Sequence, residues 1–249
     1  MKSLIESVKN CAISQSRASC SRSFLNSTVS DPVCQSIVKD MQKMTPEMLG
    51  CSGSDDPYHF EAPLNRVTID GSSEDYRLVL FFIKKGTTMP LHDHPNMSVF
   101  FRLVFGQLNY HGYDKIDEKF KYNNFSADEY AEMLESGKTI KAKRTRQMNI
   151  KESSMLYVRP SINNLHTFTA AENSCFFDIC LPNYTQESHL RKITYFKDTN
   201  ACNVDASMPF ADADVQSKRS VLTELEYHTC VPQNIPGFGI NELSYRGSM

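Results

Sequence analysis

Several features that mark common classes of protein are missing from this chain of 249 residues. It has no run of about 18 apolar residues, so we expect no transmembrane helix and no membrane partner. Its net charge of −2 gives no general attraction to nucleic acid. The N-terminal segment has no continuous apolar core and carries Glu6, which makes it a poor signal peptide. We therefore expect a cytoplasmic monomer, with the nucleus as a second location.

The eight cysteines form no CxxC pair and are irregularly spaced. This spacing is not typical of a zinc finger or of a disulfide framework, although neither is excluded. The simpler interpretation is a reduced intracellular protein whose thiols are mostly buried. These cysteines are at positions 11, 20, 34, 51, 175, 180, 202 and 230.

Hydrophobic patterning divides the chain into two parts. Residues 3–22 and 30–44 are predicted to be helices, the second with an apolar stripe of Val33, Ile37, Met41 and Met44. A turn-rich linker covers 45–58, so we expect residues 1–58 to form a helical N-terminal extension. From about residue 65, short segments rich in β-branched and aromatic residues alternate with Gly, Pro or Asn, which predicts an all-β barrel or jelly roll over 59–249.

Residues 117–150 interrupt this strand pattern. They contain a basic stretch, and we interpret the range as a solvated insertion between barrel strands, with a rim that attracts an acidic partner as the alternative. Residues 198–218 are expected to form a mobile loop. The basic residues are Lys138, Lys141, Lys143, Arg144 and Arg146.

Three histidines carry the strongest chemical signal. His92 and His94 are two residues apart, so on a β-strand both imidazoles point to the same face and can bind one metal ion. His166, in a turn-like segment far downstream, can complete one face of the coordination shell and leave other positions open. We expect these three residues to be the metal ligands.

The residues around the histidines resemble the two sequence motifs of the cupin superfamily. Gly86, His92, His94 and Gly106 have the spacing of the first motif, but Val99 replaces the usual glutamate ligand. Three neutral imidazoles leave the charge of a divalent metal uncompensated, which favours an anionic ligand such as a thiolate. Near His166 the usual glycine of the second motif is Asn163, which also tolerates a left-handed backbone. Cupin motifs imply a double-stranded β-helix, the jelly-roll barrel predicted above, with N-terminal helices added.

Three longer segments, 89–106, 164–170 and 177–184, resemble the cysteamine dioxygenase and plant cysteine oxidase family. The resemblance covers roughly residues 60–249. It implies a mononuclear Fe(II) held by the three histidines and the addition of both atoms of O₂ to a thiol, giving a sulfinic acid. The implied partners are O₂ and either cysteamine, a small thiol, or a protein with an N-terminal cysteine.

The chain departs from the family pattern in several places. Asn96 replaces a glycine, and Asn183 replaces the second proline of a Pro-Pro-Tyr sequence. Ile193 occupies the position near which the animal enzymes have a cysteine that couples to a tyrosine, so we predict no such crosslink to Tyr195. No departure removes a metal ligand, but together they leave the substrate preference open.

Other residues are candidates for the surroundings of the metal. The resemblance places Asp178 near the iron, where it could orient a ligand histidine or accept a hydrogen bond from the substrate amine, or could serve only structure. Tyr184 and Tyr195 could donate hydrogen bonds to oxygen at the metal, or pack as ordinary aromatic residues. Arg102 is interpreted as an outward-facing strand residue. The remaining histidines, His59, His111, His189 and His228, are expected not to be ligands.

Two other functions remain open at this point. A cupin without catalytic activity that binds a ligand or partner is compatible with the missing glutamate ligand. Another metal-dependent cupin enzyme, such as an isomerase or a dioxygenase of free cysteine, would fit the three histidines. An arginine in the pocket that binds a carboxylate would favour free cysteine, and the sequence does not place one.

Overall fold

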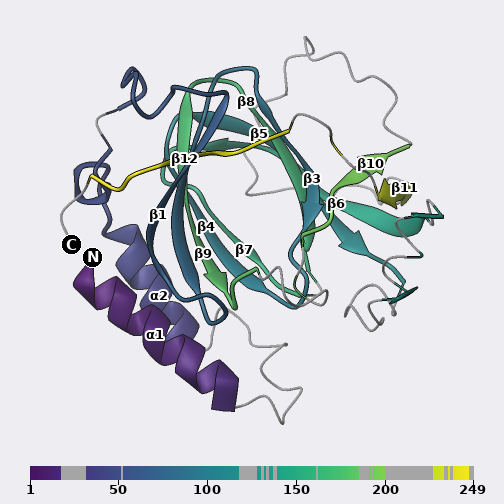
Figure 1. The fold of residues 1–249 in the computed structure, drawn as a ribbon, viewed down its shortest axis with the longest axis horizontal. Coiled ribbons are helices and arrows are strands. Elements are labelled where there is room, and N and C mark those ends of the chain that lie inside the picture. Colours follow the sequence, from purple (N-terminus) through teal and green to yellow (C-terminus); the bar gives the residue numbers. More distant parts are fainter. Residues whose placement is uncertain are drawn as a thin grey trace, which may run out of the picture.

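The computed structural model describes residues 1–17, 32–51, 53–117, 139–160, 162–184, 193–199, 227–232 and 238–246, with residues 128, 129, 132, 135, 136, 191 and 235. Two six-stranded sheets face each other as a barrel, and two helices lie against the outside of one sheet (Figure 1). This arrangement confirms the expected all-β jelly-roll barrel with N-terminal helices. The expected loop over 198–218 lies almost wholly outside the described residues.

The strands of each sheet come from distant parts of the chain, as in a double-stranded β-helix. The first sheet contains, in spatial order, β12 (Asn241–Leu243), β1 (Leu64–Gly71), β2 (Arg77–Ile83), β9 (Ser174–Leu181), β4 (Ser98–Phe105) and β7 (Met155–Val158). The second sheet contains β10 (Phe196–Asp198), β11 (Tyr227–Pro232), β6 (Ile140–Lys151), β5 (Gln107–Lys115), β8 (Leu165–Ala170) and β3 (Thr88–Asp93). All neighbours are antiparallel except β1 and β12, which are parallel.

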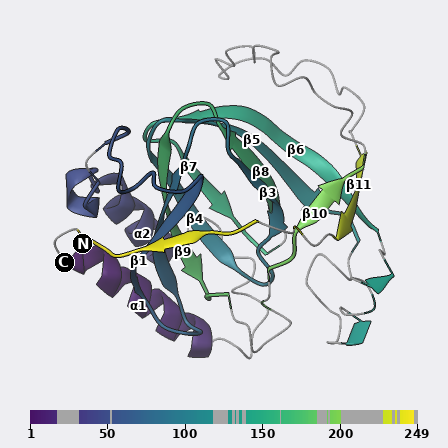
Figure 2. The same ribbon diagram turned by 45° about the horizontal axis from the view of Figure 1, so that its top comes forward.

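The helices cover the outer face of the first sheet (Figure 2). α1 (Lys2–Arg17) and α2 (Pro32–Gln42) bury Leu4, Val8, Ile37 and Met41 against this sheet, so the predicted helices and the apolar stripe of the second are confirmed where described. A short 3-10 helix (Glu47–Leu49) follows. None of the helices in the described residues combines the length and the apolar character needed to cross a bilayer.

Arg102 joins α2 to the barrel. It projects outward from β4, as expected, but it is buried under the helix rather than exposed to solvent. Its guanidinium group donates hydrogen bonds to the carbonyl oxygens of Met41 and Met44. Carbonyl groups at and beyond the end of a helix lack partners within the helix, and Arg102 supplies donors to two of them.

The range 117–150 is only partly an insertion. Ile140–Lys151 forms β6, which is paired with β5 from Gln107 to Lys115, so the last part of the range belongs to the barrel. The side chains between Ala142 and Ile150 are exposed or half-buried. The strand therefore lacks the alternation of apolar and polar residues that marks a half-buried strand in a sequence. Residues 118–127 lie outside the described part of the chain.

The second sheet curls so that its two edges meet. Asp93 at the end of β3 donates a backbone hydrogen bond to Thr194 just before β10 (3.1 Å), and His92 forms an isolated bridge with Tyr195. A small apolar cluster fills the space enclosed by this curl: Leu91, Tyr113, Ile140, Ala142, Leu165, Phe196 and Cys230. The curl therefore covers the face of β3 and β8 that points away from the main barrel.

The six cysteines in the described residues are buried and form no disulfide, and their burial agrees with the expectation that most thiols are buried. The sulfurs of Cys51 and Cys175 lie 3.8 Å apart without forming a disulfide. At the C-terminal end, β12 pairs with β1 at the edge of the first sheet, and Arg246 stacks on Tyr58 with 3.4 Å between its Cζ atom and the ring centre.

Candidate metal centre

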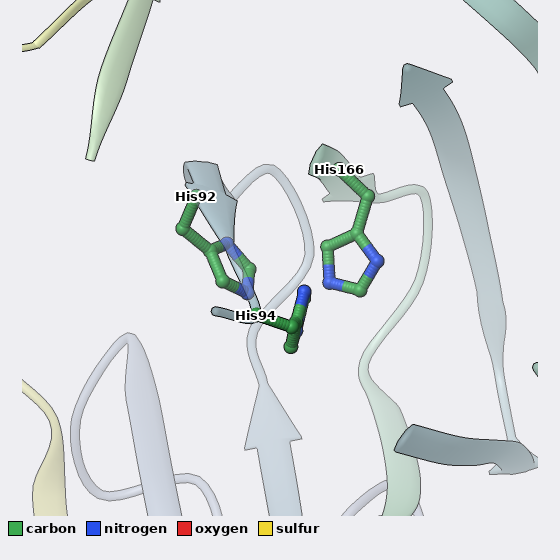
Figure 3. Close-up of side chains that lie close together, drawn as sticks. All are labelled: His92, His94 and His166. Carbon is green, nitrogen blue, oxygen red and sulfur yellow. The ribbon is translucent and has the colours of Figure 1, made fainter. Parts of the chain in front are cut away.

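The three predicted ligand histidines lie close together on the inner face of the second sheet (Figure 3). His92 lies on β3, His94 follows the end of that strand, and His166 lies on β8 directly opposite His92 in the strand register. Their ring centres are 4.5 to 4.9 Å apart, and their ligand atoms all lie within 4.8 Å of one another. The exposed fractions are 6%, 3% and 3%, so the imidazoles form one buried group.

Hydrogen bonds orient each imidazole through its Nδ1 atom. Nδ1 of His92 lies 2.7 Å from the carbonyl oxygen of Pro90, and Nδ1 of His94 lies 2.9 Å from that of Asn164. A carbonyl oxygen only accepts, so Nδ1 carries the hydrogen and Nε2 keeps its lone pair. Nδ1 of His166 lies 3.5 Å from the hydroxyl of Tyr110. The Nε2 atoms of His92 and His94 are therefore available for one ion, and Nε2 of His166 joins them when its Nδ1 donates to the Tyr110 hydroxyl.

Electrostatics keeps the three rings neutral. Burial lowers the pKa of His92, and it lowers the pKa values of His94 and His166 well below the ordinary 6.5, because a charged ring would lose its hydration. Each of the latter two is also disfavoured as a cation by its histidine neighbours. Neutral imidazole is the form that binds metal, so the site is prepared for a cation.

Asn164 connects the two ligand segments. Its side-chain amide donates to the carbonyl oxygen of His94 (2.7 Å), and its carbonyl oxygen Oδ1 accepts from the His94 backbone N–H (3.3 Å). The neighbouring Asn163 has φ 53°, and Asn96 after His94 has φ 54°. Both asparagines thus adopt the left-handed conformation for which glycine is usual, as expected for Asn163.

Asp93 projects away from the imidazoles and anchors this end of β3. One carboxylate oxygen accepts from the Lys115 ammonium (2.8 Å), and the other accepts from the Thr194 backbone N–H (2.8 Å). The side chains of Asp93 and Lys115 are each only 4% exposed. An ion pair buried between the candidate ligands His92 and His94 holds the backbone that carries them.

The three tyrosines near the site differ in their positions. Tyr184 donates its hydroxyl to the Asp93 carbonyl oxygen (2.8 Å), and its ring centre lies 6.0 Å from that of His94. Tyr195 lies beside His92, with 6.2 Å between ring centres, and packs against Phe238. Tyr110, which the sequence did not single out, is fully buried on β5, and burial raises its pKa.

Asp178 lies on the barrel-facing side of β9. Its neighbours on this face, Phe176 and Cys180, belong to the core and to a cluster beside Val99, as the alternation along the strand predicted. Burial raises the pKa of Asp178 well above its ordinary value. Within the described part of the chain no hydrogen-bond donor reaches Oδ1 of Asp178. This carboxyl oxygen is therefore available to a ligand.

Sequence reasoning missed Tyr110, Lys115 and Asn164. Asn164 follows a left-handed asparagine in the turn before His166, which is a weak signal. Lys115 and Tyr110 could be found only from the strand register, because their partners are 22 and 56 residues away. His59 and His111 lie apart from the group of three histidines, while His189 lies outside the described residues and the side chain of His228 is not described.

A jelly-roll barrel with three inward-facing histidines on adjacent strands defines a cupin with a candidate mononuclear metal centre. The chain belongs to the PCO_ADO family, whose model matches residues 41–248. The predicted resemblance to cysteamine dioxygenases and plant cysteine oxidases is thereby confirmed.

Two curated relatives agree with this family. A probable 2-aminoethanethiol dioxygenase of Dictyostelium discoideum is 25% identical over 151 residues, which cover 59% of this chain and 63% of the relative. The 2-aminoethanethiol dioxygenase of Mus musculus is 26% identical over 121 residues, 46% of this chain and 47% of the relative. The chain thus spans about half to two thirds of the length of these relatives.

Solved structures with some similarity include KdgF from Halomonas sp. and an RmlC-like cupin from Shewanella frigidimarina. The match to KdgF has a TM-score of 0.34 at 11% identity and covers 51% of this chain and 84% of the KdgF chain. The second has a TM-score of 0.33 at 13% identity and covers 48% and 77%.

Proposed function

We propose that this protein is a metal-dependent thiol dioxygenase that converts R–SH and O₂ into the sulfinic acid R–SO₂H. The observation that carries the proposal is the group of three buried, neutral histidines with free Nε2 atoms, in a chain of the PCO_ADO family. The reaction balances without an external reductant, because the thiol sulfur gives up four electrons and receives both oxygen atoms.

His92, His94 and His166 would hold the metal, and we propose Fe(II). The donor set fits such an ion because all three nitrogens are buried and neutral, and their Nδ1 atoms already have partners. Imidazole suits several first-row metals, but a reaction with O₂ needs one that changes oxidation state. When bound, such a metal lowers the pKa of a thiol and brings the sulfur and O₂ together on one open face.

The charge of the site favours a thiolate substrate. Val99 occupies the position at which many cupins carry a glutamate ligand, and it is buried with Met97, Val158 and Cys180. No carboxylate there competes for the cation, so an anionic sulfur can supply the missing negative charge. The same apolar cluster keeps water away from this side of the site.

Asp178, Tyr184 and Tyr195 would act around the substrate. The unpartnered Oδ1 of Asp178 would accept a hydrogen bond from the substrate amine. Tyr184 would hold the backbone between the two ligand histidines through the Asp93 carbonyl oxygen. Tyr195, half-buried beside His92, would donate its hydroxyl toward the reacting oxygen atoms. Tyr110 adds a fourth role, because its hydroxyl orients His166.

We propose cysteamine and the N-terminal cysteine of a peptide or protein as substrates, since both place an amine two carbons from the thiol. The names of the two curated relatives support the first. We propose a location in the cytoplasm or nucleus, which the burial of the described cysteines without disulfides supports. We also propose that the protein is a monomer.

The test is mass spectrometry of thiol products after aerobic incubation with protein loaded with Fe(II). Cysteamine, free cysteine and a peptide with a free N-terminal cysteine are assayed in parallel, with a chelated sample as the control. We expect a gain of two oxygen atoms that requires the metal.

The alternatives give different results in the same experiment. Oxidation of free cysteine alone would identify a different thiol dioxygenase. A protein that binds iron but oxidises none of the three thiols would contradict the proposal and favour a cupin that only binds a ligand.

A further inference from the structure

The basic residues of β6 divide between two faces of the second sheet. Gly112 on β5 is in register with His166 on β8 and with Arg146 on β6. Residues directly opposite each other on neighbouring strands project to the same face. Arg146 therefore shares the inner face with the metal-binding histidines, two strand spacings or about 9.6 Å from His166.

Residue 112, which lies between Arg146 and His166 on β5, is glycine and has no side chain of its own. The ring of Tyr110 covers the glycine, and a Cβ atom at this position would lie 2.9 Å from that ring. The Arg146 charge reaches the same tyrosine, where it opposes the rise in pKa that burial causes. Arg146 thus faces the surroundings of the metal centre even though it is itself exposed.

Lys143 and Lys141 continue this face outward along β6. Lys143 is in register with Asp114, and Lys141 is two residues further along the strand. Arg144 is turned to the opposite face, because the register shifts between Gly112 and Tyr113 and pairs Arg144 with Tyr113 of the small apolar cluster. We call Arg146, Lys143 and Lys141 the basic wall.

Within the described part of the chain, Asp114 is the carboxylate in register with the basic wall, opposite Lys143. None of the carboxylates described there forms an ion pair with Arg146, Lys143 or Lys141. Lys141 and Arg146 are exposed and Lys143 is half-buried, so all are open to a ligand. Uncompensated charge of one sign beside a site attracts ligands of the opposite sign.

We propose that the basic wall binds acidic side chains that follow the N-terminal cysteine of a peptide substrate. The inference rests on the proposed function and specifies its substrate class. An extended peptide rises about 3.3 Å per residue, so a cysteine at the histidines would bring its third or fourth residue to Arg146. The next few residues would pass Lys143 and Lys141. Cysteamine is too short to reach the wall.

The first experiment compares three peptides that differ only in charge: Cys-Gly-Asp-Glu-Asp-Ala-Gly, its Asn-Gln-Asn analogue and its Lys-Lys-Lys analogue, all with amidated C-termini. Exposed ion pairs contribute a factor of about 2 to 5 each, so we expect the acidic peptide to exceed the neutral one about tenfold in kcat/KM. The basic peptide should be slower still. The advantage should shrink as salt rises from about 0.02 to 0.3 M.

The second experiment locates the effect. The Arg146→Gln/Lys143→Gln variant should lose most of the preference for the acidic peptide and oxidise cysteamine as the unchanged protein does. Lys151→Gln is the matched control, because Lys151 is exposed on the same strand at its other end. It removes one charge and should retain the preference.

Binding to the metal-free protein separates this inference from the proposed function. Fluorescence anisotropy of the same peptides, labelled at their C-termini, should show the acidic peptide binding more tightly than the neutral one, and only if Arg146 and Lys143 are present. Equal binding and equal turnover of all three peptides would overturn the role of the wall, whereas absence of thiol oxidation with intact acidic binding would overturn the proposed function alone.

Discussion

The two sheets of the barrel contribute in different ways to the protein. Every residue of β9 in the first sheet is buried, since helices cover one face of that sheet and the barrel core the other. β5 in the second sheet alternates between buried and half-buried residues over its first six positions. The three histidines come from the second sheet and its β3 end, and the first sheet contributes Asp178 and an apolar cluster that includes Val99 and Cys180 to the inner face beside the site. The first sheet is thus a framework, and the second sheet carries the chemistry.

This division predicts that changes in the second sheet affect activity most. His94→Ala removes one metal ligand, and we expect at least about a 10³-fold loss of thiol oxidation together with loss of bound metal. Metal analysis and product mass spectrometry measure both effects. His111→Ala, on β5 but outside the histidine group, is the control. Normal turnover by the His94 variant would contradict the ligand assignment.

The Asp93–Lys115 pair should show that part of the second sheet also stabilises the fold. Lys115→Met leaves the buried Asp93 carboxylate without its cation, which should lower the free energy of unfolding by about 3 to 5 kcal/mol in urea denaturation. Asp93→Asn in the same chain removes the unpaired charge and should restore part of the loss. A change below about 1 kcal/mol in the single variant would contradict this role.

A cavity between α2 and the first sheet should lower the free energy of unfolding without changing the candidate metal centre. Ile37 on α2 is fully buried against the first sheet, so Ile37→Ala should cost about 2 to 5 kcal/mol of unfolding free energy. The metal content and kcat of the molecules that remain folded should be unchanged. A selective loss of metal affinity would show that the two sheets are coupled and not separate in function.

The pH dependence of stability should come from the histidine group. The folded pKa values of His92, His94 and His166 are lowered, so below about pH 6.5 the unfolded chain binds protons that the folded protein does not. The metal-free protein should lose stability as the pH falls below this value. A variant with glutamine at all three positions should lose less stability on acidification. His59 would still act in the same direction, and Asp178, whose pKa is raised in the folded protein, would act in the opposite one.

The smallest expected effect concerns the turn after His94. Asn96 has φ 54°, so Asn96→Gly should leave the stability within about 0.5 kcal/mol of the starting value, whereas Asn96→Ala should cost about 1 to 2 kcal/mol. Thermal unfolding of the two variants measures the difference. Equal midpoints would show that the left-handed conformation is not what selects the residue.

The fold class and the group of three histidines could be predicted because their signals are local. Two histidines at strand spacing and a third after a turn need only the alternation of a strand. β6 could not be recognised, because its residues from Lys143 to Asn149 include no buried side chain and its place in the barrel comes from pairing with β5. Lysine normally favours solvent, so the burial of Lys115 follows only from Asp93 on another strand.

The contacts between the N-terminal helices and the first sheet also affect the order of folding. α1 is synthesised before every strand of the barrel, yet its apolar face packs in one cluster with residues of β9, which ends at Leu181. At about 5 to 20 residues per second, the ribosome needs roughly 8 to 30 seconds to make the chain between them. During this interval the helices have no completed sheet to cover. Such distant contacts imply slow folding, with the first sheet completed only after β9 has been made.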